Sequence, residues 1–169
     1  MLVELPVVWV VGLNVVGWFA IQWGLAWGFT QIPSAWFPPG RACAWETSGR
    51  FYERVFRIKR WKAWLPDAAR WFNGGFAKGT LTSRKPEYLA LFIRETRRGE
   101  LCHWLAIGCA PAFLIWNPWW GEWIIVAYAL AANLPCIIVQ RYNRIRLVGM
   151  LSLCSKADKT AVVSPHSLR

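Results

Sequence analysis

The sequence predicts an all-α integral membrane protein with about three transmembrane helices and cytoplasmic interfacial amphipathic helices. Apolar residues make up 56% of the 169 positions, and 14 of the positions are Trp. Residues 5–29 carry no formal charge, and two later apolar runs are bordered by polar, basic blocks. This is not the composition of an ordinary soluble domain, so we predict a single membrane domain over residues 1–169.

The first predicted transmembrane helix covers residues 5–29. At about 1.5 Å per residue, an uncharged run of this length crosses a hydrocarbon core of roughly 30 Å. The residues before it include Glu4 but neither Lys nor Arg. Secretory signals begin with a basic region, so we expect this helix to remain as an anchor.

Residues 30–100 are predicted to form a basic cytoplasmic or interfacial segment. It begins with a Pro-rich stretch over 31–40 that cannot be helical. Residues 50–65 place apolar side chains on one helical face and Lys and Arg on the other, which predicts a helix lying in the membrane interface. Asn73-Gly-Gly75 indicates a tight turn, and residues 87–99 predict a second amphipathic helix.

Residues 101–116 and 123–139 are predicted to form a transmembrane hairpin. Both runs are short for a span, so they need interfacial Trp residues or a locally thin bilayer. The connecting turn supplies such residues, because Trp side chains surround it as an aromatic belt would. The Trp positions are 116, 119, 120 and 123.

The distribution of charge predicts the orientation. Residues 30–100 hold 14 of the 20 Lys and Arg, residues 140–169 hold the remainder, and the 117–122 turn holds none. By the positive-inside rule, both basic regions are cytoplasmic and the N-terminus is outside. The protein is therefore predicted to be multi-pass in the cell membrane, with a basic cytoplasmic tail over 140–169 that we expect to be mobile from Leu153 onward.

The net charge of +11 does not indicate a nucleic-acid partner here, because the basic residues border hydrophobic spans. Anionic membrane lipids or a phosphate-bearing substrate explain them better. The five Cys residues are odd in number, lack a C-x-x-C pair, and lie partly in predicted spans. They predict neither a disulfide framework nor a metal site.

The start of the hairpin carries the predicted catalytic pair. On a helix continuing from residue 87, Glu95, Glu100 and His103 fall within an arc of roughly 140°, and the neighbouring arginines at 94, 97 and 98 fall opposite. A carboxylate three residues before His103 could hold the imidazole in one tautomer, so that it acts as general base on a hydroxyl. The alternative is a structural pair at a membrane junction. The chain has two His and no second pair of this kind, so the pattern does not indicate a metal site.

The end of the hairpin carries a second polar face. Asn133, Gln140 and Arg144 lie within roughly 40° of one another on a helix, with Arg141 and Asn143 beside them. Inter-helix hydrogen bonding and a basic stop-transfer cluster are the alternative explanation. Because the hairpin returns both polar faces to one membrane surface, we predict a shared site there.

Two blocks resemble the glycosyl-4,4'-diaponeurosporenoate acyltransferase family of bacterial membrane proteins. They are ETRRGELCHW at residues 95–104 and NLPCIIVQRYNRIRL at residues 133–147. Shorter matches support them at Trp45-Glu46, Gly49-Arg50, Arg60-Trp-Lys62 and Leu65-Pro-Asp67. The resemblance covers roughly residues 45–147 and implies transfer of a fatty acyl chain from coenzyme A to a sugar hydroxyl of a glycosylated carotenoid acid.

On this implication acyl-CoA is a co-substrate, no cofactor is needed, and the partners are membrane lipids, a lipophilic glycosylated acceptor and neighbouring pathway enzymes. Ile145 replaces a Pro typical of pigment-pathway members, so the reaction class transfers better than the acceptor. The predicted catalytic residues are His103 and Glu100, and the predicted substrate-binding residues are Glu95, Arg97, Arg98, Trp104, Asn133, Gln140, Arg141, Tyr142, Asn143, Arg144, Arg60, Trp61 and Lys62.

A second function stays open on the sequence alone. The chain could be a lipid- or pigment-binding scaffold subunit of a membrane complex, for which the many Trp residues and the basic belt would suffice. A membrane-bound metal hydrolase is a more distant alternative. Substituting His103 separates an enzyme, which loses turnover, from a scaffold, which does not.

Overall fold

The computed structural model describes residues 2–38, 40, 46, 49–65, 76 and 81–163, with side chains as far as Lys156. All regular structure in this part of the chain is helical, as predicted. The helices are α1 (Val7–Gln31), α2 (Arg50–Arg54), α3 (Ile58–Trp61), α4 (Pro86–Gly108) and α5 (Trp119–Val163), with short 3-10 turns at η1 (Ser34–Trp36), η3 (Lys62–Trp64) and η5 (Ala110–Ile115).

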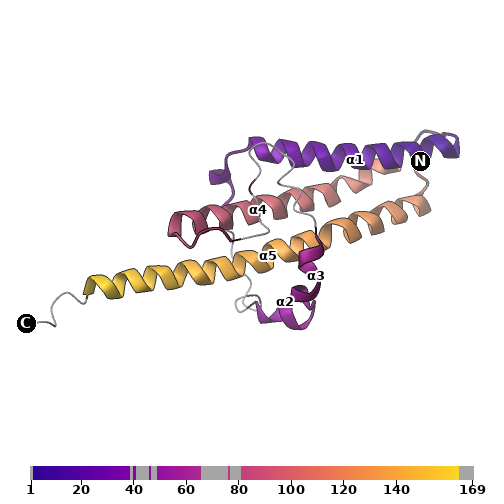
Figure 1. The fold of residues 1–169 in the computed structure, drawn as a ribbon. Coiled ribbons are helices and arrows are strands. Elements are labelled where there is room, and N and C mark those ends of the chain that lie inside the picture. The colour runs from indigo at the N-terminus through magenta and orange to yellow at the C-terminus, as the bar shows by residue number, and fades with distance from the viewer. Residues whose placement is uncertain are drawn as a thin grey trace, which may run out of the picture.

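Three long helices lie side by side (Figure 1). Helices α1 and α5 run in the same direction, and α4 packs antiparallel to both. Helix α5 extends well past the other two toward the C-terminus, and the short helices α2 and α3 cover its middle (Figure 1). The bundle therefore has a compact Trp-rich end and an end from which α5 projects.

The Trp-rich end is fixed by polar contacts between α1 and the turn before α5. The Asn14 side-chain oxygen accepts hydrogen bonds from Trp116 Nε1 and Asn117 Nδ2, both at 2.7 Å. Backbone N–H groups of Leu2 and Val3 donate to the Ile115 carbonyl. Next to these bonds lies an apolar core of Trp18, Ala110, Phe113 and Ala129. The turn is thereby tied to the start of α1.

Two helices of the described chain are long and apolar enough to cross a bilayer, namely α1 and the Trp119–Lys156 part of α5. Trp18 is the one buried residue of α1, the helix has several half-buried residues, and apolar side chains such as Val8, Trp9 and Phe19 are exposed along it. The predicted arm 101–116 consists of the last turns of α4 and of η5. It changes to 3-10 geometry where Pro111 lacks the N–H that an α-helix requires.

The prediction of one interfacial helix over 50–65 is wrong. Helix α2 ends at Arg54, and Arg57 adopts left-handed backbone angles with φ of 48° before α3 begins. The break lets Tyr52 and Ile58 both become buried against Tyr142 of α5. Packing against α5 thus overrides the continuous amphipathic pattern.

The predicted boundary between the 123–139 arm and the tail is absent. Helix α5 is continuous for 45 residues, passes through Pro135 and continues to Val163. At Pro135 one backbone bond is lost, yet the neighbouring turns preserve the helix. The predictions for Trp45, for the Pro66-Asp67 end signal, for the 73–75 turn and for residues 164–169 lie outside the described residues.

Candidate active site between α1, α4 and α5

His103 of α4 contacts Asn133 of α5. His103 Nδ1 lies 2.8 Å from Asn133 Oδ1, and Gln22 Nε2 of α1 donates to the same oxygen at 3.2 Å. Asn133 is fully buried, whereas the imidazole is half-buried. Three helices thus meet at one amide, and one of them presents a partly accessible imidazole.

The bonds of Asn133 define the tautomer of His103. Asn133 Nδ2 donates to the Ala129 carbonyl at 2.9 Å, so its Oδ1 faces Gln22 and His103. An amide oxygen only accepts hydrogen bonds, and therefore Nδ1 of His103 carries the proton. The lone pair is left on Nε2, which is the nitrogen that can accept a proton from a substrate.

Glu100 lies one turn before His103 and binds three arginines. Its carboxylate is 2.6 Å from Arg144, 2.9 Å from Arg141 and 3.1 Å from Arg97. Only 1% of the Glu100 side chain is exposed. Burial alone would raise the pKa of this carboxyl, but the three guanidinium groups outweigh burial and lower it. Glu100 is therefore a fixed anion that joins α4 to α5.

The predicted separation of acidic and basic faces on this helix is wrong. Arg97 pairs with Glu100, and Arg98 pairs with Glu95 at 2.7 Å, each three residues apart. Arginine side chains are long enough to reach around the helix to a neighbour at that spacing. The catalytic roles of Glu100 and His103 remain predictions, but the group that the structure places on Nδ1 is Asn133.

A second carboxylate completes the charged cluster. Arg141 also pairs with Glu46 at 3.2 Å, and the buried Glu46 accepts a hydrogen bond from Tyr52. Burial first, and then this hydrogen bond to Glu46, raise the pKa of Tyr52. Sequence reasoning named Glu46 only within a resemblance motif and left out Gln22, Tyr52 and Glu53. Helical periodicity relates residues within one helix. It could therefore not place Glu46 or Tyr52 beside α5, which lies much later in the chain.

Of the other predicted residues, some lie on the face of α5 that carries Asn133 and the others lie elsewhere. Gln140 belongs to the same face of α5, and its buried Oε1 has no hydrogen-bond donor within the described part of the chain. Tyr142 is buried on a different face and donates to Glu53 Oε1 of α2 at 2.7 Å. Lys62 and Trp61 lie near Tyr142. Glu95 and Arg98 pair with each other near Ile32. Of the remaining predicted residues, Asn143 is half-buried, and Arg60 and Trp104 are exposed.

The depth of these groups follows from the length of α5. Asn133 is about 21 Å along the helix from Trp119, and Arg141 is about 33 Å from it, at 1.5 Å per residue. If Trp119 marks one edge of a hydrocarbon core of roughly 30 Å, Arg141 lies at the other edge. His103 then lies inside the bilayer, about 12 Å before the arginine cluster. No group of three metal-ligating side chains occurs within the described residues.

Comparison with known proteins gives consistent matches. Residues 33–153 match the family model described as glycosyl-4,4'-diaponeurosporenoate acyltransferase. A Staphylococcus haemolyticus protein of that name is 39% identical over 116 residues, which is 69% of this chain and 67% of the relative. Proteins of that name from two Staphylococcus aureus strains, USA300 and NCTC 8325 / PS 47, are each 31% identical over 145 residues, or 82% of this chain and 86% of the relative. No solved structure matches.

Proposed function

Because the chain belongs to the glycosyl-4,4'-diaponeurosporenoate acyltransferase family, we propose that it moves a fatty acyl group from acyl-CoA to a sugar hydroxyl of a glycosylated carotenoid or related glycolipid. The reaction class follows from the family. The donor, the acceptor and the residues that act on them are our inferences from the site.

The observation that carries the proposal is the hydrogen bond from His103 of α4 to Asn133 of α5, with Gln140 on the same face of α5. The tautomer set by Asn133 makes Nε2 of His103 the basic nitrogen, and Gln140 has a buried oxygen with no donor among the described residues. Asn133 and Gln140 are about 10 Å apart along α5 and lie within roughly 20° of each other around it. A sugar with several hydroxyl groups would satisfy Gln140 with one and present another to His103.

The proposed reaction uses the imidazole as base and then as acid. Nε2 of His103 takes the proton of the acceptor hydroxyl while its oxygen attacks the thioester carbonyl. The carbonyl oxygen becomes an oxyanion, and Arg141 and Arg144, about 12 Å farther along α5, would bind the phosphates of the coenzyme A. Collapse of that intermediate breaks the C–S bond, and the imidazolium returns the proton to the departing CoA thiolate. The ester and free CoA are the products.

We also propose a multi-pass orientation in which the charged cluster faces the cytoplasm and the N-terminus is outside. The Trp-rich turn, which holds no Lys or Arg, would lie at the outer surface. Acyl-CoA is cytosolic, so its reactive end would approach from the cytoplasmic side. The polyene of the acceptor and the acyl chain of the donor would lie in the bilayer beside α1, α4 and α5.

The test is His103→Gln, with His166→Gln as the matched control. Lipids and pigments of cells expressing each variant are profiled by mass spectrometry, alongside the membrane level of the protein. We expect the species that is heavier by one acyl group to fall about 100-fold or more in His103→Gln, since a general base contributes 10² to 10⁴ in rate. An unchanged product at a normal protein level would reject the mechanism and favour the scaffold function.

A further inference from the structure

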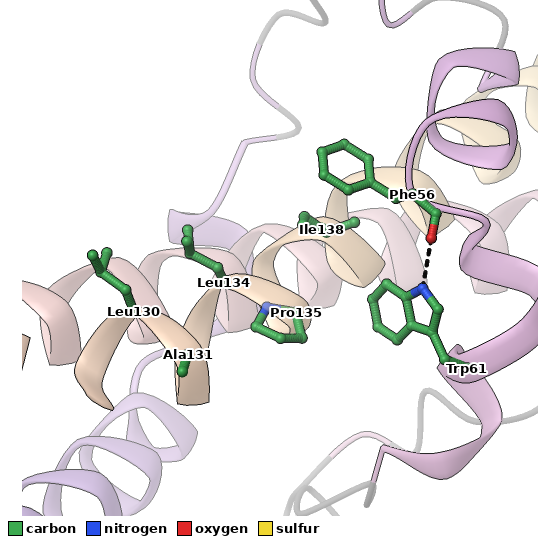
Figure 2. A pocket seen from close by; sticks show the side chains of 7 residues that line it. All are labelled: Phe56, Trp61, Leu130, Ala131, Leu134, Pro135 and Ile138. Carbon is green, nitrogen blue, oxygen red and sulfur yellow. Dashed lines mark hydrogen bonds between the residues drawn. The ribbon is translucent and has the colours of Figure 1, made fainter. Parts of the chain in front are cut away.

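An open apolar groove of about 340 Å³ lies on α5 where the α2–α3 segment approaches it (Figure 2). Trp61 Nε1 donates to the Phe56 carbonyl at 2.7 Å, which holds the indole at the edge of the groove. The lining is wholly apolar apart from that bond. It consists of Phe56, Trp61, Leu130, Ala131, Leu134, Pro135 and Ile138.

The groove is on a different face of α5 from the candidate active site. At 100° per residue, the centre of its lining on α5 is roughly 130° away from Asn133. Leu130 and Ile138 are about 12 Å apart along the helix, which approaches the roughly 15 Å thickness of one hydrocarbon leaflet. The groove therefore has the direction and length to hold an acyl chain of a lipid in one leaflet.

Two cations stand at the end of the groove nearest the charged end of the bundle. Tyr142 follows Ile138 by one helical turn, and over its ring lie Lys62 Nζ at 5.3 Å and the Arg146 guanidinium at 5.6 Å from the centroid. Neither cation makes an ion pair within the described part of the chain. Glu53, the carboxylate beside them, is already bound to Lys59 at 2.8 Å and to Tyr142.

The charges around Lys62 have an electrostatic consequence for its amine, and the opposing contribution of Glu53 is the smallest of them. Burial first, and then the nearby charges of Arg146 and Lys59, lower the pKa of this amine. An anion placed between Lys62 and Arg146 would relieve the repulsion between them. Ile138 of the groove precedes Tyr142 by one helical turn, so the same ligand can fill the groove and reach the cations over the Tyr142 ring.

We propose that this groove binds one anionic phospholipid of the bilayer, with an acyl chain along α5 and the phosphate between Lys62 and Arg146. In a phospholipid the phosphate adjoins the glycerol that carries the chains, which matches the single helical turn between Ile138 of the groove and Tyr142 beneath the cations. In acyl-CoA a long pantetheine arm separates the two. The site is independent of the proposed acyl transfer and needs only that α5 crosses the bilayer.

The test is native mass spectrometry of the full chain in detergent, with phosphatidylglycerol or phosphatidylcholine of identical chains added. We expect one phosphatidylglycerol to be retained about tenfold better than phosphatidylcholine. The preference should vanish in the double variant Lys62→Gln with Arg146→Gln, and Leu134→Trp should reduce retention of both lipids by filling the groove. The matched controls are Arg84→Gln, before the start of α4, and Val16→Trp, on α1; both positions are exposed and both variants should retain the preference.

Three outcomes would overturn the proposal. They are equal retention of the two lipids by the unchanged protein, a preference that survives the double variant, and displacement of phosphatidylglycerol by an equimolar long-chain acyl-CoA. Lys62→Arg keeps the charge and should keep the preference, which separates loss of the cation from misfolding. Retention is measured without turnover, so the result is independent of whether His103→Gln abolishes acyl transfer.

Discussion

Two buried glutamates lie toward opposite ends of the three-helix bundle, and their surroundings differ. Glu100, near the charged end, is held by three arginines from α4 and α5. Glu122, at the Trp-rich end, is 8% exposed, and neither carboxylate oxygen has a hydrogen-bond donor within the described residues. A paired buried carboxylate can hold helices together, whereas an unpaired one costs free energy. Glu100 therefore stabilises the packing of α4 against α5, whereas Glu122 lowers the stability of the folded protein.

The two ends also differ in how they join α1 to the rest of the bundle. The Trp-rich end uses neutral amides, with Asn14 and Asn117 bonded to each other in both directions. Nearer the other end, one amide, Asn133, bonds α1 through Gln22 and also bonds His103. At the Trp-rich end the side-chain amides hold helices together, whereas nearer the other end the amide of Asn133 also orients His103, the candidate base.

The largest effect should come from Glu100→Gln. Removing one partner of a buried charge network leaves Arg141 and Arg144 without their shared anion, at a cost of about 3–5 kcal/mol in unfolding free energy. We expect a lower thermal midpoint in detergent and a reduced membrane level. Glu122→Gln is the matched control at the other end. Equal midpoints for the two variants would contradict the comparison.

The Glu100 pairs also predict how stability depends on pH. The folded-state pKa of Glu100 is lowered, so its contribution is fully present above the ordinary value near 4.5 and is lost as pH falls through the lower folded value. Thermal midpoints measured from pH 7 down to pH 3 should decline less steeply in Glu100→Gln than in the unchanged protein. Parallel pH profiles would show that other carboxylates dominate the acid response.

The next effect should come from Asn133→Ala. The imidazole loses the acceptor that fixes Nδ1, so we expect kcat to fall about 10²-fold from misorientation while KM changes little. A purely structural role of Asn133 would lower the amount of folded protein but leave kcat per folded molecule unchanged. Turnover is therefore expressed per molecule of folded enzyme. Asn133→Asp keeps an acceptor on Nδ1 and should recover part of the lost turnover.

A smaller effect is expected for Asn14→Ala at the Trp-rich end. Trp116 Nε1 and Asn117 Nδ2 lose their shared acceptor, which should cost about 1–3 kcal/mol of stability. The measurement is thermal unfolding in detergent together with acyl transfer per folded molecule. We expect turnover to stay within about twofold, and a loss comparable to that of Asn133→Ala would erase the distinction between the two ends.

The smallest effect, and one of opposite sign, is expected for Glu122→Gln. The neutral amide of similar shape removes an unpaired buried carboxylate, so the thermal midpoint should stay equal or rise by an amount equivalent to about 1 kcal/mol. The measurement uses the same detergent and pH as the Glu100→Gln experiment. A fall of several kcal/mol would mean that Glu122 has a partner of its own.

The sequence predicted the helical class, the first apolar helix and the proximity of the two polar faces, because charge and hydrophobicity pattern determine these features. It did not predict the break at Arg57, since packing of Tyr52 and Ile58 against Tyr142 outweighs the local pattern. It paired Glu100 with His103 on spacing alone. The partner that the structure gives to Nδ1, Asn133, is 30 positions away in the chain, and helical periodicity cannot identify such long-range pairs.

The unbroken course of α5 has a mechanical consequence. Because the helix is a stiff rod through Pro135 and beyond, the angular phase between Asn133 and the arginines is set by residue count alone. One extra residue between them would advance Arg141 and Arg144 by about 1.5 Å and turn them by about 100°, away from Glu100. Asn133 and the arginines Arg141 and Arg144 therefore have a fixed relative orientation on α5, and a rotation of the helix moves all of them together.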